Sequence, residues 1–114
     1  MLNKKYRFHS RGGVRYVYQK GETVRSPKMS LVFVDNERGF TRVGVVVSKK
    51  VEKTAVGRNR IRRRIYEAIR NNFDLLPKKR DYIFVVYSKD VLKIPFNELE
   101  CRLGELVEQS KGVI

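Results

Sequence analysis

The sequence holds few of the side chains from which protein active sites and metal sites are built. Cys101 is its only cysteine, His9 is its only histidine, and tryptophan is absent. A single cysteine excludes an internal disulfide, and one cysteine with one histidine does not suggest a metal site. A nuclease site would need clustered carboxylates or a histidine acid and base, whereas Glu98 and Glu100 point to different helix faces and the other late acids are scattered. We therefore expect no catalytic residue and no cofactor bound by the protein alone.

Long apolar runs are missing as well. No segment is long enough to span a bilayer, which predicts no association with membranes. Residues 1–5 are basic but lead into no apolar stretch, so no signal peptide is predicted and a cytoplasmic location is expected. A length of 114 residues fits a single domain over 1–114, and an apolar content of 41% is ordinary for a folded chain.

What the sequence has in excess is positive charge, with a formal net charge of +14. Residues 1–28 hold 8 Lys and Arg against 1 acid, and residues 49–64 hold 8 against 1, while residues 29–48 and 65–114 are balanced. Concentrated charge of one sign opposes a compact fold unless a polyanion neutralises it. A membrane surface is the weaker candidate, because no basic amphipathic terminal helix carries bulky apolar anchors. The distribution favours a defined nucleic-acid surface.

The apolar periodicity predicts an α+β fold with helices packed against a sheet. A short helix with Val14, Val17 and Tyr18 on one face comes first. Two strands on either side of a loop at 35–39 are expected to pair antiparallel as a hairpin. The nearly continuous apolar segment 82–87 predicts a buried central strand. The predicted elements are a helix at 14–20, strands at 28–34 and 42–47, a helix from about 58 to 73, a strand at 82–87 and a helix from residue 96.

The stretch 48–64 carries the most specific chemistry. On a helix, Ile61, Ile65 and Ile69 lie on one buried stripe, and arginines occupy both flanks. Guanidinium groups bind phosphate oxygens in bidentate fashion and stack on bases, and the helix N-terminus adds backbone donors. The predicted flanks are Asn59, Arg63, Tyr66 and Arg70 on one side and Arg60 and Arg64 on the other, with Arg58 and Arg62 near the edge of the apolar stripe.

A solvated basic helix face is the simpler alternative. Such a face commonly carries acidic partners one turn away, yet only Glu67 stands near Arg63 and Arg64. The lysines that precede the helix increase the like-charge repulsion instead of relieving it. These features favour the binding of nucleic-acid phosphates.

The same stretch resembles a known family. Val-Ser-Lys-Lys-Val at 47–51, followed by Ala-Val-x-Arg-Asn-Arg-Ile-Arg-Arg-x-Ile-x-Glu at 55–67, is similar to the signature of the bacterial ribonuclease P protein component. Segment 7–21, which ends in Val-Tyr-x-Lys-Gly, resembles the first helix of that family. Arg-Val-Gly-Val at 42–45 and Asp-Tyr-Ile at 81–83 resemble the strands before and after the signature. The resemblance covers nearly all of the chain.

The resemblance implies a single-domain α-β-β-β-α-β-α sandwich whose βαβ unit has a left-handed crossover, although the general rule favours a right-handed one. It implies a protein subunit, monomeric in the holoenzyme, of a ribonucleoprotein endonuclease. Its RNA subunit positions magnesium ions and carries out the hydrolysis. The protein would bind this ribonuclease P RNA and the 5′ leader of precursor tRNA, which is removed to give the mature tRNA 5′ end.

The resemblance also implies site residues. The leader site is expected on the sheet face opposite the core helices, in a shallow groove between the first helix and the arginine-rich helix. Tyr18 keeps an aromatic position of the family, whereas Val14 and Val32 stand where the family often has aromatic residues. Tyr18 could instead be a core residue. The expected contacts to the catalytic RNA are Lys49, Lys50, Lys53, Arg58, Asn59, Arg60, Arg62, Arg63, Arg64 and Arg70, and those to the leader are Val14, Tyr18, Val32 and Lys50.

Two other function classes stay open from the residues alone. One is a non-enzymatic ribosomal or RNA-chaperone protein of similar basicity, and the other is a DNA-binding protein, whose motifs are not found. Co-purification with a structured RNA that cleaves precursor tRNA at low magnesium would support the ribonuclease P interpretation. Co-purification with ribosomal RNA alone would support the ribosomal one.

The two basic blocks predict a strongly salt-dependent complex with a structured RNA. Each neutralised phosphate releases counterions, so the logarithm of affinity should fall steeply with the logarithm of salt concentration. Contact with about six to ten phosphates would weaken binding roughly 10³-fold to 10⁵-fold between about 50 and 200 mM salt. Filter binding across this range measures the slope, and a nearly flat line would contradict the electrostatic interpretation.

Overall fold

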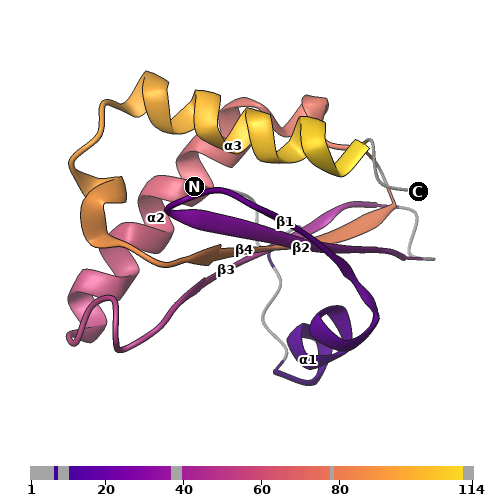
Figure 1. Ribbon diagram of the computed structural model, residues 1–114, viewed down its shortest axis with the longest axis horizontal. Coiled ribbons are helices and arrows are strands. Elements are labelled where there is room, and N and C mark those ends of the chain that lie inside the picture. Colours follow the sequence, from indigo (N-terminus) through magenta and orange to yellow (C-terminus); the bar gives the residue numbers. More distant parts are fainter. Residues whose placement is uncertain (1–6, 8–10, 37–39, 78, 112–114) are drawn as a thin grey trace.

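The computed structural model describes residue 7 and residues 11–36, 40–77 and 79–111. A four-stranded sheet with strand order β1-β2-β4-β3 carries α2 and α3 on one face and α1 on the other (Figure 1). This order of elements confirms the predicted α-β-β-β-α-β-α fold. The elements are α1 (Arg11–Lys20), β1 (Glu22–Arg25), β2 (Met29–Asp35), β3 (Arg42–Val47), α2 (Ala55–Asn71), the 3-10 turn η2 (Phe73–Leu75), β4 (Arg80–Val86), the 3-10 turn η3 (Lys89–Leu92) and α3 (Phe96–Lys111).

The prediction that the strands at 28–34 and 42–47, which are β2 and β3, form an antiparallel hairpin is wrong. β2 pairs antiparallel with β1 and with β4, whereas β3 pairs parallel with β4 and makes no ladder with β2. The hairpin of the sheet is instead β1–β2, whose turn is held by the backbone N–H and the hydroxyl of Ser26, both donating to the Met29 carbonyl at 2.8 Å. Of the predicted loop at 35–39, residues 37–39 lie outside the described part of the chain.

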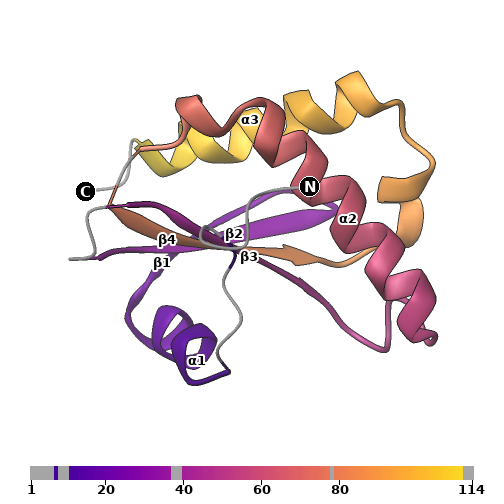
Figure 2. The ribbon, with the colours of Figure 1, turned by 180° about the vertical axis from the view of Figure 1, so that it is seen from behind.

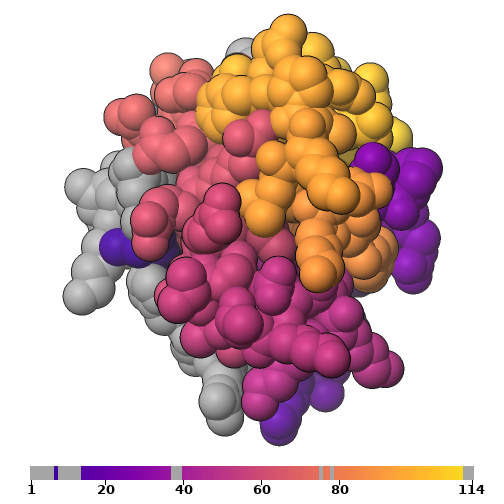
Figure 3. Space-filling model, turned by 90° about the vertical axis from the view of Figure 1, so that its left-hand side faces the viewer, coloured from indigo at the N-terminus to yellow at the C-terminus, as the bar shows by residue number. Residues whose placement is uncertain are grey.

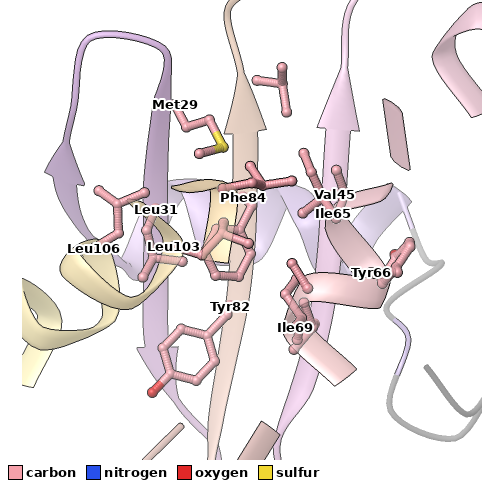
Figure 4. Close-up of a cluster of buried hydrophobic side chains, with 14 of the residues drawn as sticks. Met29, Leu31, Val45, Ile65, Tyr66, Ile69, Tyr82, Phe84, Leu103 and Leu106 are labelled. Atoms are coloured by element: carbon pink, nitrogen blue, oxygen red, sulfur yellow. The ribbon is translucent and has the colours of Figure 1, made fainter. Parts of the chain in front are cut away.

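β4 takes the position between β2 and β3 because it is apolar on both faces. Tyr82 and Phe84 point into the main core, where Leu103 of α3 and Ile69 of α2 lie on either side of them (Figure 4). Ile83 points the other way and is fully buried. The prediction of a buried central strand at 82–87 is confirmed, with its last residue just beyond the strand.

The opposite face of the sheet carries a second, smaller cluster. Val17 of α1 is fully buried against Val32 of β2 and Ile83 of β4, and Val14 packs at the edge. Figure 2 shows α1 below the sheet, on the side away from α2 and α3. The helix begins at Arg11, three residues earlier than predicted, and so includes Gly12 and Gly13.

The start of α2 is fixed by a local polar network. Thr54 caps the helix, with its Oγ1 accepting from the Gly57 N–H at 3.0 Å. The Glu52 carboxylate folds back and accepts from the Thr54 N–H and Oγ1, both at 3.3 Å. A Cβ at Gly57 would come within 2.5 Å of the Glu52 side chain, so only glycine admits this arrangement. The helix spans 55–71, slightly earlier than the predicted 58–73.

Tyr82 gives the fold a pH dependence that can be measured. Burial raises the pKa of Tyr82 to about 12, from an ordinary value of 10.0. Below pH 10 the Tyr82 hydroxyl is protonated in both the folded and the unfolded state, so its full contribution to the free energy of unfolding is present. As pH rises from about 10 through 12 the unfolded chain ionises first, so stability falls by up to roughly 2–3 kcal/mol. Thermal melts across this range should show a shallower fall for Tyr82→Phe, and equal slopes would contradict the burial of this hydroxyl.

Candidate nucleic-acid interface

One group of the predicted cations is exposed and unengaged. Lys49, Lys50 and Lys53 lie in the connection between β3 and α2, and Arg60 and Arg63 lie on α2 itself. All five are exposed, and none of them makes a side-chain hydrogen bond or ion pair with another described residue. Their charges are therefore available to phosphates, and they are the strongest site candidates that the sequence predicted.

A second group of the predicted arginines holds the protein together. Arg64 donates through Nε to the Val91 carbonyl at 3.0 Å and through a second nitrogen to the Ile94 carbonyl, and its guanidinium lies 5.5 Å from the Phe96 ring centre. It thereby fastens the segment before α3 to α2, and Figure 3 shows these two parts in direct contact. Arg58 donates to the carbonyls of Glu52 and Lys53, at 3.1 and 2.9 Å, across the start of α2.

The remaining predicted residues are engaged within α2. Arg62 donates to the Asn59 Oδ1 at 2.7 Å, and Arg70 pairs with Glu67 at 3.2 Å. Both pairs are single-turn contacts on the solvent side of the helix, which are weak and can be exchanged for a phosphate. Asn59 and Arg70 are exposed, so they stay accessible to a ligand.

The arginines of α2 are grouped differently from the prediction. Arg60, Arg63 and Arg64 line one shallow hollow of about 380 Å³ together with Leu92 and Phe96, so Arg63 does not lie on a flank opposite to Arg60. Tyr66 was also placed on the exposed flank, and this is wrong because its side chain is buried against the sheet. Burial raises the pKa of Tyr66.

The helix N-terminus offers fewer backbone donors than the sequence predicted. The Gly57 N–H is already bonded to Thr54, and the Glu52 carboxylate lies against the same turn. A carboxylate at this place competes with any incoming phosphate. The lysines of the connection are therefore better phosphate ligands than the helix end.

The sheet face around α1 carries exposed aromatic side chains. Tyr18 is 44% exposed and Tyr87 is 48% exposed, while Val17 takes the core position on α1. Tyr18 is thus not the core residue of this helix. Burial of the hydroxyl raises the pKa of Tyr18, and the nearby Tyr87 raises it further by a smaller amount. The Tyr87 hydroxyl donates to the Ser30 Oγ at 2.7 Å, which fixes its ring beside the sheet.

The other predicted leader residues lie below this surface. Val32 is only 6% exposed and Val14 is half-buried, so both support α1. The arginine-rich helix lies on the opposite face of the sheet, so it does not border this surface (Figure 2). Only the connection with Lys50, which follows β3, reaches the same end of the sheet as Tyr87, because β3 and β4 run parallel. Tyr87 was not among the predicted site residues, although strand alternation after Ile83 and Val85 predicts that it faces away from the main core.

The described residues hold no group of three or more Asp, Glu, His or Cys side chains that could bind a metal ion. His9 lies outside the described residues. Within the described parts of the chain, every helix is too short or too polar to cross a lipid bilayer.

Comparison with known proteins places the chain in a family. The family model described as ribonuclease P matches residues 2–111. The ribonuclease P protein component of Chloroflexus aurantiacus is 34% identical over 109 residues, which cover 96% of this chain and 80% of that protein. The one from Symbiobacterium thermophilum is 36% identical over 112 residues, covering 96% and 94% of the two chains.

Solved structures agree with the fold. A mutant ribonuclease P protein of Staphylococcus aureus, described as defective in mRNA degradation, aligns with a TM-score of 0.81 at 24% identity over 95% of this chain and 90% of that one. The ribonuclease P protein of Thermotoga maritima aligns with a TM-score of 0.81 at 23% identity over 90% and 96% of the chains. From the family model and the relatives above 30% identity, the chain belongs to the bacterial ribonuclease P protein family.

Proposed function

We propose that this chain, as the protein subunit of ribonuclease P, binds the catalytic RNA through the cations at the start of α2. The proposal rests on one observation about five cations: they are exposed, and none has a hydrogen-bond or ion-pair partner in the described part of the chain. They are Lys49, Lys50, Lys53, Arg60 and Arg63. Phosphate contacts release counterions and supply most of the sequence-independent affinity for RNA. Because α2 is packed on the sheet, the backbone that carries Arg60 and Arg63 is held in place before the RNA arrives.

The other residues of the signature differ in how directly they contact the RNA. Asn59, Arg62 and Arg70 exchange weak contacts within the helix for contacts with RNA. Arg58 and Arg64 face the RNA only with those parts of their guanidinium groups that the backbone carbonyls leave free. Their main effect is on the position of the helix start and of the segment before α3.

The 5′ leader of precursor tRNA is assigned to the sheet face around α1. Single-stranded nucleic acid is bound by stacking on aromatic rings beside a basic groove. Tyr18 and Tyr87 supply two exposed rings, and Lys50 at the same end of the sheet supplies positive charge for the backbone. Val14 and Val32 hold α1 in position below these rings.

The subunit assists endonucleolytic removal of the leader and does not carry out the hydrolysis. The described side chains do not fit a protein-held magnesium site, so the proposal assigns magnesium to the RNA-containing holoenzyme. We further infer one RNA-binding domain that is monomeric in the holoenzyme and cytoplasmic. From the family resemblance we also infer a left-handed crossover in the β3–α2–β4 unit.

Substitutions on α2 should separate RNA contacts from structural contacts. Arg60→Ala and Arg63→Ala should each weaken binding of ribonuclease P RNA with little change in the melting temperature, because both side chains are exposed and unengaged. Arg64→Ala should lower stability by about 1–3 kcal/mol, since it removes two charged hydrogen bonds to backbone carbonyls. Parallel thermal melts and filter-binding assays measure both effects.

Ile65→Ala serves as the core control for these variants. Ile65 is fully buried, so its truncation should cost roughly 2–5 kcal/mol. A melting temperature for Arg60→Ala or Arg63→Ala that falls as far as that of the core variant would show that the arginine is structural. Unchanged RNA affinity in both arginine variants would remove these residues from the interface.

Substitution of Tyr18 tests the leader surface in the reconstituted holoenzyme. Tyr18→Ala should reduce the preference for precursor over mature tRNA, because stacking on one aromatic ring is worth about 1–3 kcal/mol per base. Tyr18→Phe keeps the ring and should keep the preference. Tyr16 is a matched control, since it lies on the same helix, is 52% exposed and points to another side. If Tyr16→Ala and Tyr18→Ala have the same effect, or both tRNA forms lose affinity equally, the leader is bound elsewhere.

A further inference from the structure

A groove between α2 and α3 lies outside the proposed RNA and leader surfaces. Its volume is about 820 Å³, and it opens where the second half of α2 and the middle of α3 pass over the sheet. Ile69, Leu103 and Phe84 form its apolar floor, and Figure 4 shows Phe84 between these two helices. Glu100, Glu105 and Glu108 stand on its rim. We call this feature the acidic groove.

The charge of the acidic groove is opposite to that of the protein. None of the residues that line it is Lys or Arg, although the chain has 26 of these and only 12 acids. Glu108 pairs with Lys111 at 2.8 Å and Glu100 accepts from the Asn72 amide at 2.7 Å, while Glu105 is exposed. Three carboxylates against one neighbouring lysine keep this region net negative, so it repels phosphate and RNA that binds the +14 chain leaves the groove open. A ligand that fits it must be apolar on one side and positively charged at the edges.

Gly104 provides a second, independent observation. It lies in the middle of α3, where glycine is the least favourable residue after proline. A Cβ built at this position would meet no atom within 4 Å, so packing inside the chain does not require glycine. Glycine on the wall of a groove allows the backbone of another helix to approach closely. Gly104 therefore leaves the wall of the groove open to close approach by another backbone.

We propose that the acidic groove binds a basic amphipathic helix of a partner protein. The apolar face of that helix enters between Ile69 and Leu103. Its lysines or arginines pair with Glu105 and replace Lys111, an exposed surface partner, at Glu108. The helix crosses α3 at Gly104. This is the helix-in-groove mode of recognition, in which apolar side chains spaced by three and four residues anchor the ligand. The inference concerns a protein partner and does not depend on the proposed RNA contacts.

The chain supplies its own reporter for a test. Cys101 is the only cysteine, is exposed and lines the acidic groove. The probe is a synthetic helical peptide of about 18 residues with leucine along one face and lysine elsewhere, a length that exceeds the roughly 12 to 15 residues below which helices are marginal. The peptide should slow the reaction of Cys101 with a thiol reagent in a saturable manner, by several-fold or more. A matched peptide with glutamate in place of lysine should not.

Variants locate the binding on the groove. Gly104→Ala should raise the melting temperature of the free protein, because alanine favours the helix and meets no neighbour, yet it should weaken the peptide about tenfold. Glu105→Lys should also abolish the protection of Cys101. Glu98→Lys is the matched control, because it makes the same charge change on α3 outside the groove and should bind the peptide like the unmodified chain.

Four results would overturn the proposal. The first two are a lysine peptide that does not protect Cys101 and a glutamate peptide that protects it equally. The third is a peptide affinity that Gly104→Ala and Glu105→Lys leave unchanged. The fourth is a chain that sediments alone as a dimer which these variants dissociate. The same assay with bound ribonuclease P RNA separates this proposal from RNA binding. RNA alone should leave Cys101 reactive, and the peptide should still protect it. Protection by RNA alone would assign the groove to the RNA.

Discussion

Eight lysine and arginine side chains lie within residues 49–64, and their mutual repulsion opposes the folding of the first half of α2. The apolar stripe of the same helix overcomes this repulsion. Ile61 and Ile65 are fully buried between the sheet and α3, so the helix cannot separate from the core without exposing them. The core therefore fixes the backbone beneath the cationic surface, although Arg60 and Arg63 have no acidic partner among the described residues. An RNA ligand that binds it relieves repulsion already present in the fold.

Some arginines of α2 stabilise the fold and others are exposed for RNA binding, and residue type alone does not reveal which is which. Arg64 and Arg58 donate to backbone carbonyls, which ties the connecting segments to the helix. Arg60 and Arg63 have no hydrogen-bond or ion-pair partner among the described residues. A run of arginines thus serves two purposes at neighbouring positions, because successive positions on the helix face different directions, some toward neighbouring chain segments and others toward solvent.

Local pattern predicted most of the fold and the composition of the site, but not the pairing of strands. Alternation and helical spacing gave the helices and β2, β3 and β4 to within a few residues, because these signals depend on neighbouring positions. The hairpin prediction for β2 and β3 failed because both strands pair with β4, which comes later in the sequence, and local pattern does not show such a long-range pairing. Tyr66 was misplaced for a similar reason. Helical geometry puts it at the edge of the apolar stripe, and only the position of the sheet decides that it is buried.

The two faces of the sheet explain why this small protein can present several different surfaces. The face under α2 and α3 contains the main core, which fixes the cations of α2 and leaves the acidic groove where the two helices diverge from each other. Among the described residues, the face under α1 holds the small cluster around Val17, which α1 covers, and Tyr18 and Tyr87 stay exposed at its border. A larger cluster on this face would have buried these rings. The small number of apolar side chains available to a chain of 114 residues therefore leaves the aromatic surface open.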